Sequence, residues 1–176
     1  MILVSNHLLR AHSIDIAPEA VIRINVAWCE SVDQLNEYLD IPHDVFLDYP
    51  TGRTKPPVPT ITLDCAIRIA AAHSNVKWFA VSNASTAERV GSIRRKLPLT
   101  IQLVPKIENE AGVYFIEKIV EAAQCTHIML DKEDLFVNVK HAERYSALVD
   151  VLRRKCGAMG VNVFELAGVI FDETTW

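Results

Sequence analysis

The sequence predicts an α/β fold in which parallel strands alternate with helices. Seven short apolar runs are separated by longer runs with helical periodicity. The short runs are apolar almost throughout, as expected for parallel strands that are covered on both faces. Two layouts fit this order of elements, an open doubly wound sheet and a closed β/α barrel, and local pattern does not decide between them.

The expected elements follow one another along the whole chain. The strands are predicted at 2–5, 21–26, 45–49, 77–82, 100–107, 127–131 and 161–166. The helices are predicted at 31–39, 62–73, 85–97, 113–124 and 141–159. The proline-rich stretch 51–60 interrupts this alternation and is predicted to be a loop, because proline fits neither a helix interior nor a central strand.

Start and stop signals support several of the helices. Ser31 begins the first helical run as an N-cap residue, and Ser85 is followed three residues later by Glu88, which is a capping-box pattern. Gly157 and Gly160 are predicted to close the last long helix. These signals indicate that the helical runs are separate elements between the strands.

Length and composition predict one globular domain over residues 1–176. A complete eight-stranded barrel typically has about 250 residues, so this chain is short for one, and its seven strands are one too few. The net charge of −4 gives no electrostatic footprint for nucleic acid. No apolar run reaches the roughly 18 residues of a membrane span.

The cysteine spacing and the first residues of the sequence indicate the cellular compartment. The four cysteines lie far apart without CxxC pairs, which favours reduced thiols over zinc ligation or a disulfide framework. The first residues have a short apolar run but no basic segment before it, unlike a signal peptide. We therefore expect a cytoplasmic protein.

Polar side chains gather where the strands end, which is where both layouts place functional groups. The second strand ends with Arg23 and Asn25 on one face, and the third offers Asp48. The fifth ends with Lys106 and Glu108, two residues apart and therefore on the same face.

These residue types suggest a site for a metal and an anion. Glu108 and Asp134, at neighbouring strand ends, can hold a hard divalent cation such as Mg²⁺, with Mn²⁺ as an alternative. Lys106 and Arg23 would supply positive charge to a carboxylate, a phosphate or the transition state. The alternative is structural: Lys106 and Glu108 form a surface ion pair, Asp48 an Asx turn, and Asp134 a helix N-terminal acid.

Several stretches resemble the barrel domain of pyruvate kinases. PKIENEAGV at 105–113, followed by IMLDKEDL at 128–135, is the most specific part of the resemblance. VIRINV at 21–26 and VFLDYPTGRTK at 45–55 are similar to that family's second and third strand ends. The similar stretches keep the family's order over about 20–170, most of the chain.

The resemblance implies roles for these residues. Lys106 would neutralise the charge of the enolate and of a transferring phosphoryl group, and Glu108 and Asp134 would be magnesium ligands. Arg23 would contact a phosphate.

Three further residues are substrate-binding candidates on the same grounds. Asn25 and Asp48 match ligands of a potassium site, so K⁺ is a further cofactor candidate. Arg53 matches an arginine in the loop after the third strand.

The chain also departs from the pyruvate kinase pattern. No lid domain is inserted after the third strand, and Ala167 stands where the family has a catalytic threonine. Ala27 replaces a potassium-ligating serine, Glu133 replaces a glycine before Asp134, and the eighth strand is missing. These differences argue against ATP synthesis, because a lid excludes water during phosphoryl transfer. Metal-dependent aldolases and citrate-lyase-type enzymes share the architecture without a lid, but they lack the strand-end lysine.

The resemblance favours a compact β/α (TIM-type) barrel of the phosphoenolpyruvate/pyruvate type, incomplete with about seven strands. We expect it to bind Mg²⁺ and a small 2-oxo acid or enol phosphate, such as pyruvate, phosphoenolpyruvate or oxaloacetate. The expected chemistry is that of an enolate: lyase, decarboxylase or aldolase-like. The alternative is a non-catalytic binding, regulatory or assembly module. A missing strand leaves an edge to cover, so we also expect a homo-oligomer.

Overall fold

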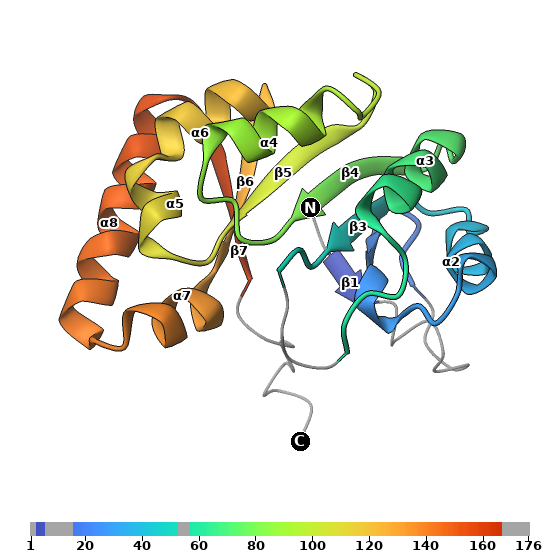
Figure 1. Ribbon diagram of the computed structural model, residues 1–176, viewed down its shortest axis with the longest axis horizontal. Helices are drawn as coiled ribbons and strands as arrows, with labels where there is room; N and C mark the ends of the chain where they lie inside the picture. Colours follow the sequence, from blue (N-terminus) through green and yellow to red (C-terminus); the bar gives the residue numbers. More distant parts are fainter. Residues whose placement is uncertain (1–2, 6–15, 53–56, 167–176) are drawn as a thin grey trace.

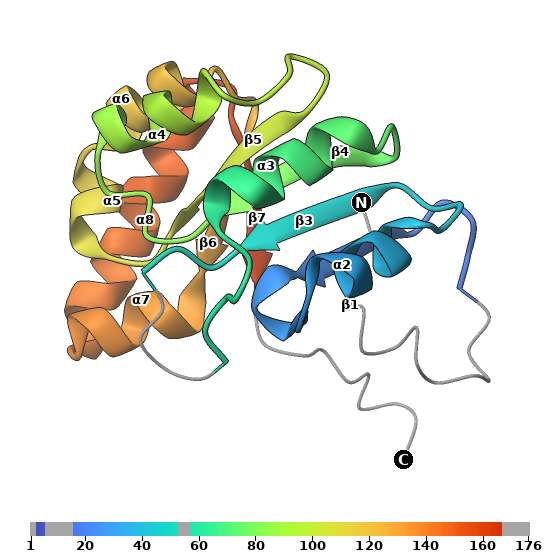
Figure 2. The same cartoon turned by 45° about the vertical axis from the view of Figure 1, so that its right-hand side comes forward.

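The computed structural model describes residues 3–5, 16–52 and 57–166. Seven parallel strands form one sheet whose spatial order follows the sequence, from β1 to β7 (Figures 1 and 2). A doubly wound sheet would reverse its strand order part-way, so the sequential order decides between the two layouts. The sheet curls into a partial barrel in which β1 and β7 do not pair with each other over the described residues. This confirms the expected incomplete β/α barrel.

The strands begin and end close to the predicted positions. Their apolar runs determine the bounds, because each run must be covered on both faces of the sheet. The strands are β1 Leu3–Ser5, β2 Val21–Asn25, β3 Val45–Tyr49, β4 Val76–Val81, β5 Gln102–Ile107, β6 His127–Asp131 and β7 Asn162–Leu166.

The helices cover the outer face of the curled sheet (Figures 1 and 2). α6, for example, buries Ile116, Ile119 and Ala123 and leaves its charged residues outside. No described helix has the length and apolar character needed to cross a membrane. The helical elements are η1 Val26–Trp28, α2 Val32–Leu39, α3 Leu63–Ala72, α4 Ala87–Arg94, α5 Glu110–Tyr114, α6 Ile116–Ala123, α7 Lys132–Val139 and α8 Ala142–Ala158.

Two of the predicted helix ends need correction. Ser31 caps α2 as expected, since its hydroxyl accepts the N–H of Gln34 at 3.1 Å. The cap of α4 is Thr86 rather than Ser85, because the Thr86 hydroxyl accepts the N–H of Arg89 at 3.4 Å. Gly157 lies inside α8, and only Gly160, with φ +68°, follows the helix end.

Two helical regions also differ from the prediction. The predicted helix 113–124 is divided into α5 and α6, and it begins earlier because Asn109 caps α5. The sequence did not predict α7. It lies directly after β6, where Asp131 caps it by accepting the N–H of Asp134 at 3.3 Å. Its apolar periodicity is weak, and only Leu135 and Val139 are buried, which explains why it was missed.

The inner face of the curled sheet carries two layers of side chains. The first, the inner apolar layer, is a buried cluster separate from the one beneath the helices; it consists of Val21, Phe46, Ala80, Val104 and Met129. Two residues further along each strand lies a second layer, the charged layer. Alternation places both layers on the same face. The charged layer consists of Arg23, Asp48, Ser82, Lys106 and Asp131.

Candidate active site at the carboxyl ends of the strands

Four of the five charged-layer residues, all except Asp48, line a cavity of about 360 Å³ at the carboxyl ends of the strands. Residues from β2, β5 and β6, from the loops after β3, β4 and β5, and from α7 meet there. The lining residues are Arg23, Asn25, Pro50, Thr51, Gly52, Ser82, Asn83, Lys106, Glu108, Asp131, Asp134, Val137 and Asn138.

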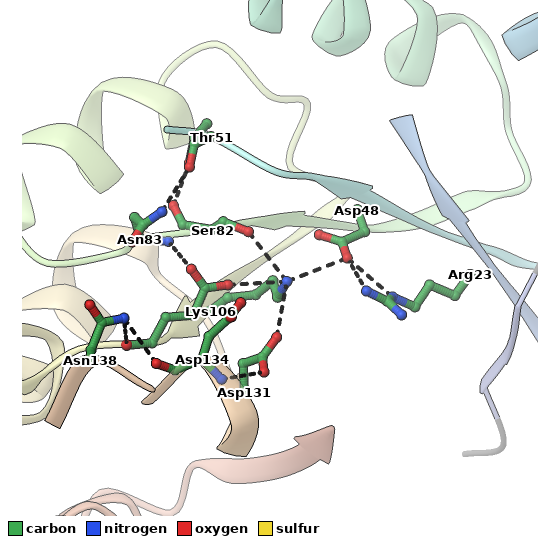
Figure 3. Close-up of polar contacts among 10 residues, drawn as sticks. Arg23, Asp48, Thr51, Ser82, Asn83, Lys106, Asp131, Asp134 and Asn138 are labelled. Atoms are coloured by element: carbon green, nitrogen blue, oxygen red, sulfur yellow. Dashed lines mark hydrogen bonds and ion pairs between the residues drawn. The ribbon is translucent and has the colours of Figure 1, made fainter. Parts of the chain in front are cut away.

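Lys106 lies at the centre of this charged layer (Figure 3). Its Nζ is 3.1 Å from Glu108 Oε1, 3.5 Å from Asp48 Oδ2 and 3.6 Å from Asp131 Oδ2, and it donates to Ser82 Oγ at 3.3 Å. Burial alone would lower the pKa of Lys106, but the carboxylates of Asp48 and Glu108 raise it overall. The residue is therefore a fixed buried cation rather than a nucleophilic amine.

Asp48 is the counter-ion of two cations. Arg23 Nε donates to Asp48 Oδ2 at 3.1 Å, and Arg23 Nη2 pairs with the same oxygen (Figure 3). Burial favours the neutral acid, but the charges of Lys106 and Arg23 outweigh it and lower the pKa of Asp48. Asp48 therefore stays ionised although its side chain has no exposed surface. Its second oxygen, Oδ1, is buried without a hydrogen-bond partner among the described residues.

Glu108 is held from both sides. Its Oε2 accepts the backbone N–H of Asn83 at 2.9 Å, while Oε1 contacts the Lys106 ammonium outside hydrogen-bonding geometry. The Asn138 side chain donates to the backbone carbonyls of Glu108 and Asp134, both at 2.9 Å, and so ties α7 to the end of β5. Burial raises the pKa of Glu108, because it disfavours the charged carboxylate.

Three carboxylates meet beside Lys106 and form what we call the acidic trio: Glu108, Asp131 and Asp134. Each offers one oxygen, and these atoms all lie within 4.8 Å of one another. Mg²⁺ and Mn²⁺ prefer hard oxygen donors of this kind, and small side-chain movements would bring all three within reach of one ion. With Asp48 the cluster has four carboxylates against the two cations Arg23 and Lys106, a formal charge of −2 that one divalent ion would balance.

The structure brings most of the sequence-predicted residues into one place. Lys106, Glu108, Asp134 and Arg23 line the cavity, and the expected closeness of the two metal-ligand candidates is present. Asn25 also lines it, but its side-chain oxygen accepts the N–H of Ala27 at 3.0 Å.

The two remaining candidates are Asp48 and Arg53. Asp48 is not among the residues that line the cavity, because it is fully buried against Arg23 and Lys106. Arg53 lies outside the described residues. Sequence reasoning did not choose Asp131 as a metal ligand. Its place at the end of the apolar run HIMLD was the available signal.

Comparisons with known proteins bear on the fold. No family model matches this chain. A crystal structure of CitE from Mycobacterium tuberculosis, in complex with magnesium, acetoacetate and coenzyme A, has a similar fold with a TM-score of 0.62. The two chains are 14% identical, and the alignment covers 99% of this chain and 66% of the CitE chain. The likeness shows the fold, and a β/α barrel is the fold that the resemblance to the pyruvate kinase barrel domain implied.

One curated protein also matches part of the sequence. The mediator of RNA polymerase II transcription subunit 12 from Neurospora crassa is 28% identical over 104 residues, which is 58% of this chain. The match spans 6% of that much longer protein, and it establishes no shared family.

Proposed function

We propose that this chain binds Mg²⁺ and a small 2-oxo acid or enol phosphate in the cavity, and that it catalyses reactions through the enolate of that substrate. The observation that carries the proposal is the acidic trio, which lies in one cavity with Lys106 and Arg23. Such a site can receive a divalent cation and an anionic substrate side by side.

The charges of the site match the needs of enolate chemistry. Mg²⁺ bound to the acidic trio would supply a Lewis acid to an oxygen of the substrate. Lys106 holds a second positive charge where negative charge would develop, and Arg23 offers a planar donor group to a carboxylate or phosphate. Both cations are already paired and oriented in the protein, so little reorganisation is needed when the substrate reacts.

Decarboxylation of oxaloacetate is the simplest reaction of this class. The bond between C3 and the departing carboxylate breaks, its electron pair moves toward the C2 carbonyl, and CO₂ leaves. The pyruvate enolate that remains takes up a proton at C3. Lys106 and Arg23 would stabilise the enolate and the remaining carboxylate.

The solved relative supports this choice of ligand class. The CitE crystal structure contains magnesium and acetoacetate, a divalent ion and a small oxo acid. Acetoacetate carries its oxo group at C3 rather than C2, so the likeness supports the broader class of small oxo acids. Phosphoryl transfer to ADP is not part of the proposal. Only residues 50–62 separate β3 from α3 in the sequence, which is too few for an inserted lid domain.

Calorimetric titration with Mg²⁺ tests the binding step. We expect wild-type protein to bind Mg²⁺, and Glu108→Gln and Asp134→Asn to lose most of this affinity because each removes a charged ligand. Glu165→Gln is the matched control, since Glu165 is also a paired strand-end carboxylate but lies outside the cavity.

Substrate turnover separates the two functional alternatives. The consumption of oxaloacetate is followed by NMR with and without Mg²⁺. It should be faster with protein and Mg²⁺ together than with Mg²⁺ alone, and this acceleration should require Lys106. Binding of Mg²⁺ and oxaloacetate without turnover would favour the non-catalytic alternative. No Mg²⁺ binding by the wild type would refute the proposed site.

A further inference from the structure

Asn83 has an unusual backbone for its place in the fold. Its φ is +54°, in the left-handed region that costs free energy for a residue with a Cβ atom and that asparagine tolerates better than most. The other described non-glycine residues with positive φ, Gln124 and Lys140, end helices α6 and α7, where this conformation is common. Asn83 instead follows a strand, at the edge of the candidate active site.

The contacts of Asn83 join the ends of three strands. Its backbone N–H donates to Glu108 Oε2 at 2.9 Å, after β5. Its side-chain Nδ2 donates to the carbonyl of Thr51 at 2.9 Å, after β3 (Figure 3). On the other side, the N–H of Ala84 donates to the carbonyl of Lys106 at 3.1 Å. The left-handed turn is therefore held by neighbours on both sides, and it aims one backbone N–H at Glu108.

This arrangement fixes a carboxylate that would otherwise turn about its last bond. Glu108 is only 3% exposed, so water cannot easily replace the Asn83 N–H. With Oε2 bound by Asn83, Oε1 is directed toward Lys106 and the interior of the charged layer. Donors that orient a metal ligand in this way contribute strongly to metal affinity.

We infer that Asn83 is a positioning residue: its left-handed backbone holds Glu108 in the orientation needed to bind a divalent cation. The inference rests on the proposed function, because it assumes that Glu108 is a metal ligand. It assigns the essential feature to the backbone of residue 83, and the side chain serves to keep that backbone in place.

Substitutions with opposite backbone preferences test this inference. Asn83→Val strongly disfavours positive φ, whereas Asn83→Gly adopts it freely, and both remove the contact with Thr51. Mn²⁺ binding to each folded variant is measured by electron paramagnetic resonance, with the fold checked by circular dichroism. We expect Asn83→Val to bind Mn²⁺ about tenfold more weakly than wild type. Asn83→Gly should stay within about twofold of wild type, because it keeps the N–H in place.

A matched control separates this role from general backbone strain. Gln124→Val places the same β-branched residue at a similar φ of 51°, but Gln124 caps α6 and lies outside the cavity. It should lose stability and keep wild-type Mn²⁺ affinity. If Asn83→Val does not fold, Asn83→Ala carries the test, since alanine also disfavours positive φ.

The outcomes distinguish this inference from the proposed function. Equal Mn²⁺ affinity in wild type, Asn83→Val and Asn83→Gly would overturn the inference and leave the metal site intact. Equal weakening in Asn83→Val and Asn83→Gly would also overturn it, because the side chain and not the backbone would then matter. Absence of Mn²⁺ binding by wild type would overturn the proposed function and this inference with it.

Discussion

The inner apolar layer and the charged layer lie on the same strands, two residues apart. Phe46 of the first layer and Asp48 of the second are both fully buried on β3, and the same change of character separates Val104 from Lys106 on β5. A step of two residues is about 6.6 Å along a strand. Over this short distance the interior of the barrel changes from a dry hydrophobic cluster to a set of ion pairs.

The difference teaches how this fold supports buried charges. The apolar layer lies directly beneath the charged layer and keeps the local dielectric low, which strengthens each pairing in the charged layer. Arg23 and Lys106 both pair with Asp48 there, so the burial of these charges is tolerated. We therefore expect the two layers to respond differently to substitution and to pH.

The largest expected effect is in the inner apolar layer. Phe46→Ala should reduce the free energy of unfolding by about 4 kcal/mol, because it leaves a cavity where Phe46 now packs edge-on against Phe164. Chemical denaturation measures this, and the loss should be the same at pH 7 and pH 3. Leu99→Ala is the control, since Leu99 is 88% exposed and its truncation should change stability by less than about 0.5 kcal/mol.

Asp48→Asn tests the charged layer. It leaves Lys106 and Arg23 without their shared counter-ion and should cost about 3 kcal/mol at pH 7. The folded pKa of Asp48 is lowered from 3.8, so its ionised form contributes stability above that pH, and the contribution disappears as the pH falls through the folded pKa. Denaturation curves from pH 7 to pH 2 should show the wild type and the variant converging. A difference that does not change with pH would contradict the assignment.

Gly112→Ala tests the close packing of α5 against the turn that contains Asn83. A Cβ atom at Gly112 would lie 2.9 Å from the carbonyl oxygen of Ala84 and 3.2 Å from Ile107 Cγ2, so the turn that contains Asn83 would have to move. We expect a loss of about 2 kcal/mol in thermal or chemical unfolding. Gly157→Ala is the matched control with the opposite sign. A Cβ atom added at Gly157 would meet no neighbouring atom within 4 Å, and Gly157 lies inside α8. The substitution should therefore stabilise the protein by about 0.5 kcal/mol.

The smallest expected effect comes from a charge cluster on the edge strand β7. Glu165 pairs with Lys132 and Arg153, and all three side chains keep about a third or more of their surface in solvent. Glu165→Gln should cost less than about 1 kcal/mol, and added salt should reduce the loss further. A loss as large as that of Asp48→Asn would show that pairing, rather than burial, sets the energetics of these charges.

Much of the fold and part of the site follow from the sequence alone. Continuous apolar runs predict the strands, and β3 and β6 begin and end at the predicted residues. The two-residue spacing of Lys106 and Glu108 predicts that they share a face, because side chains alternate along any strand. Their nearness to Asp134 follows from the tendency of consecutive strands to lie side by side.

Only the tertiary structure decided the remaining features, since each depends on contacts between residues far apart in sequence. The curl and register of the sheet bury Asp48 against Arg23 and Lys106, whereas the family resemblance implied a role in binding potassium or substrate. The same packing makes Asp131 a member of the acidic trio. It also turns Asn83 into the left-handed conformation that reaches Glu108, because the loops after β3 and β5 hold it there, and no local pattern contains that information.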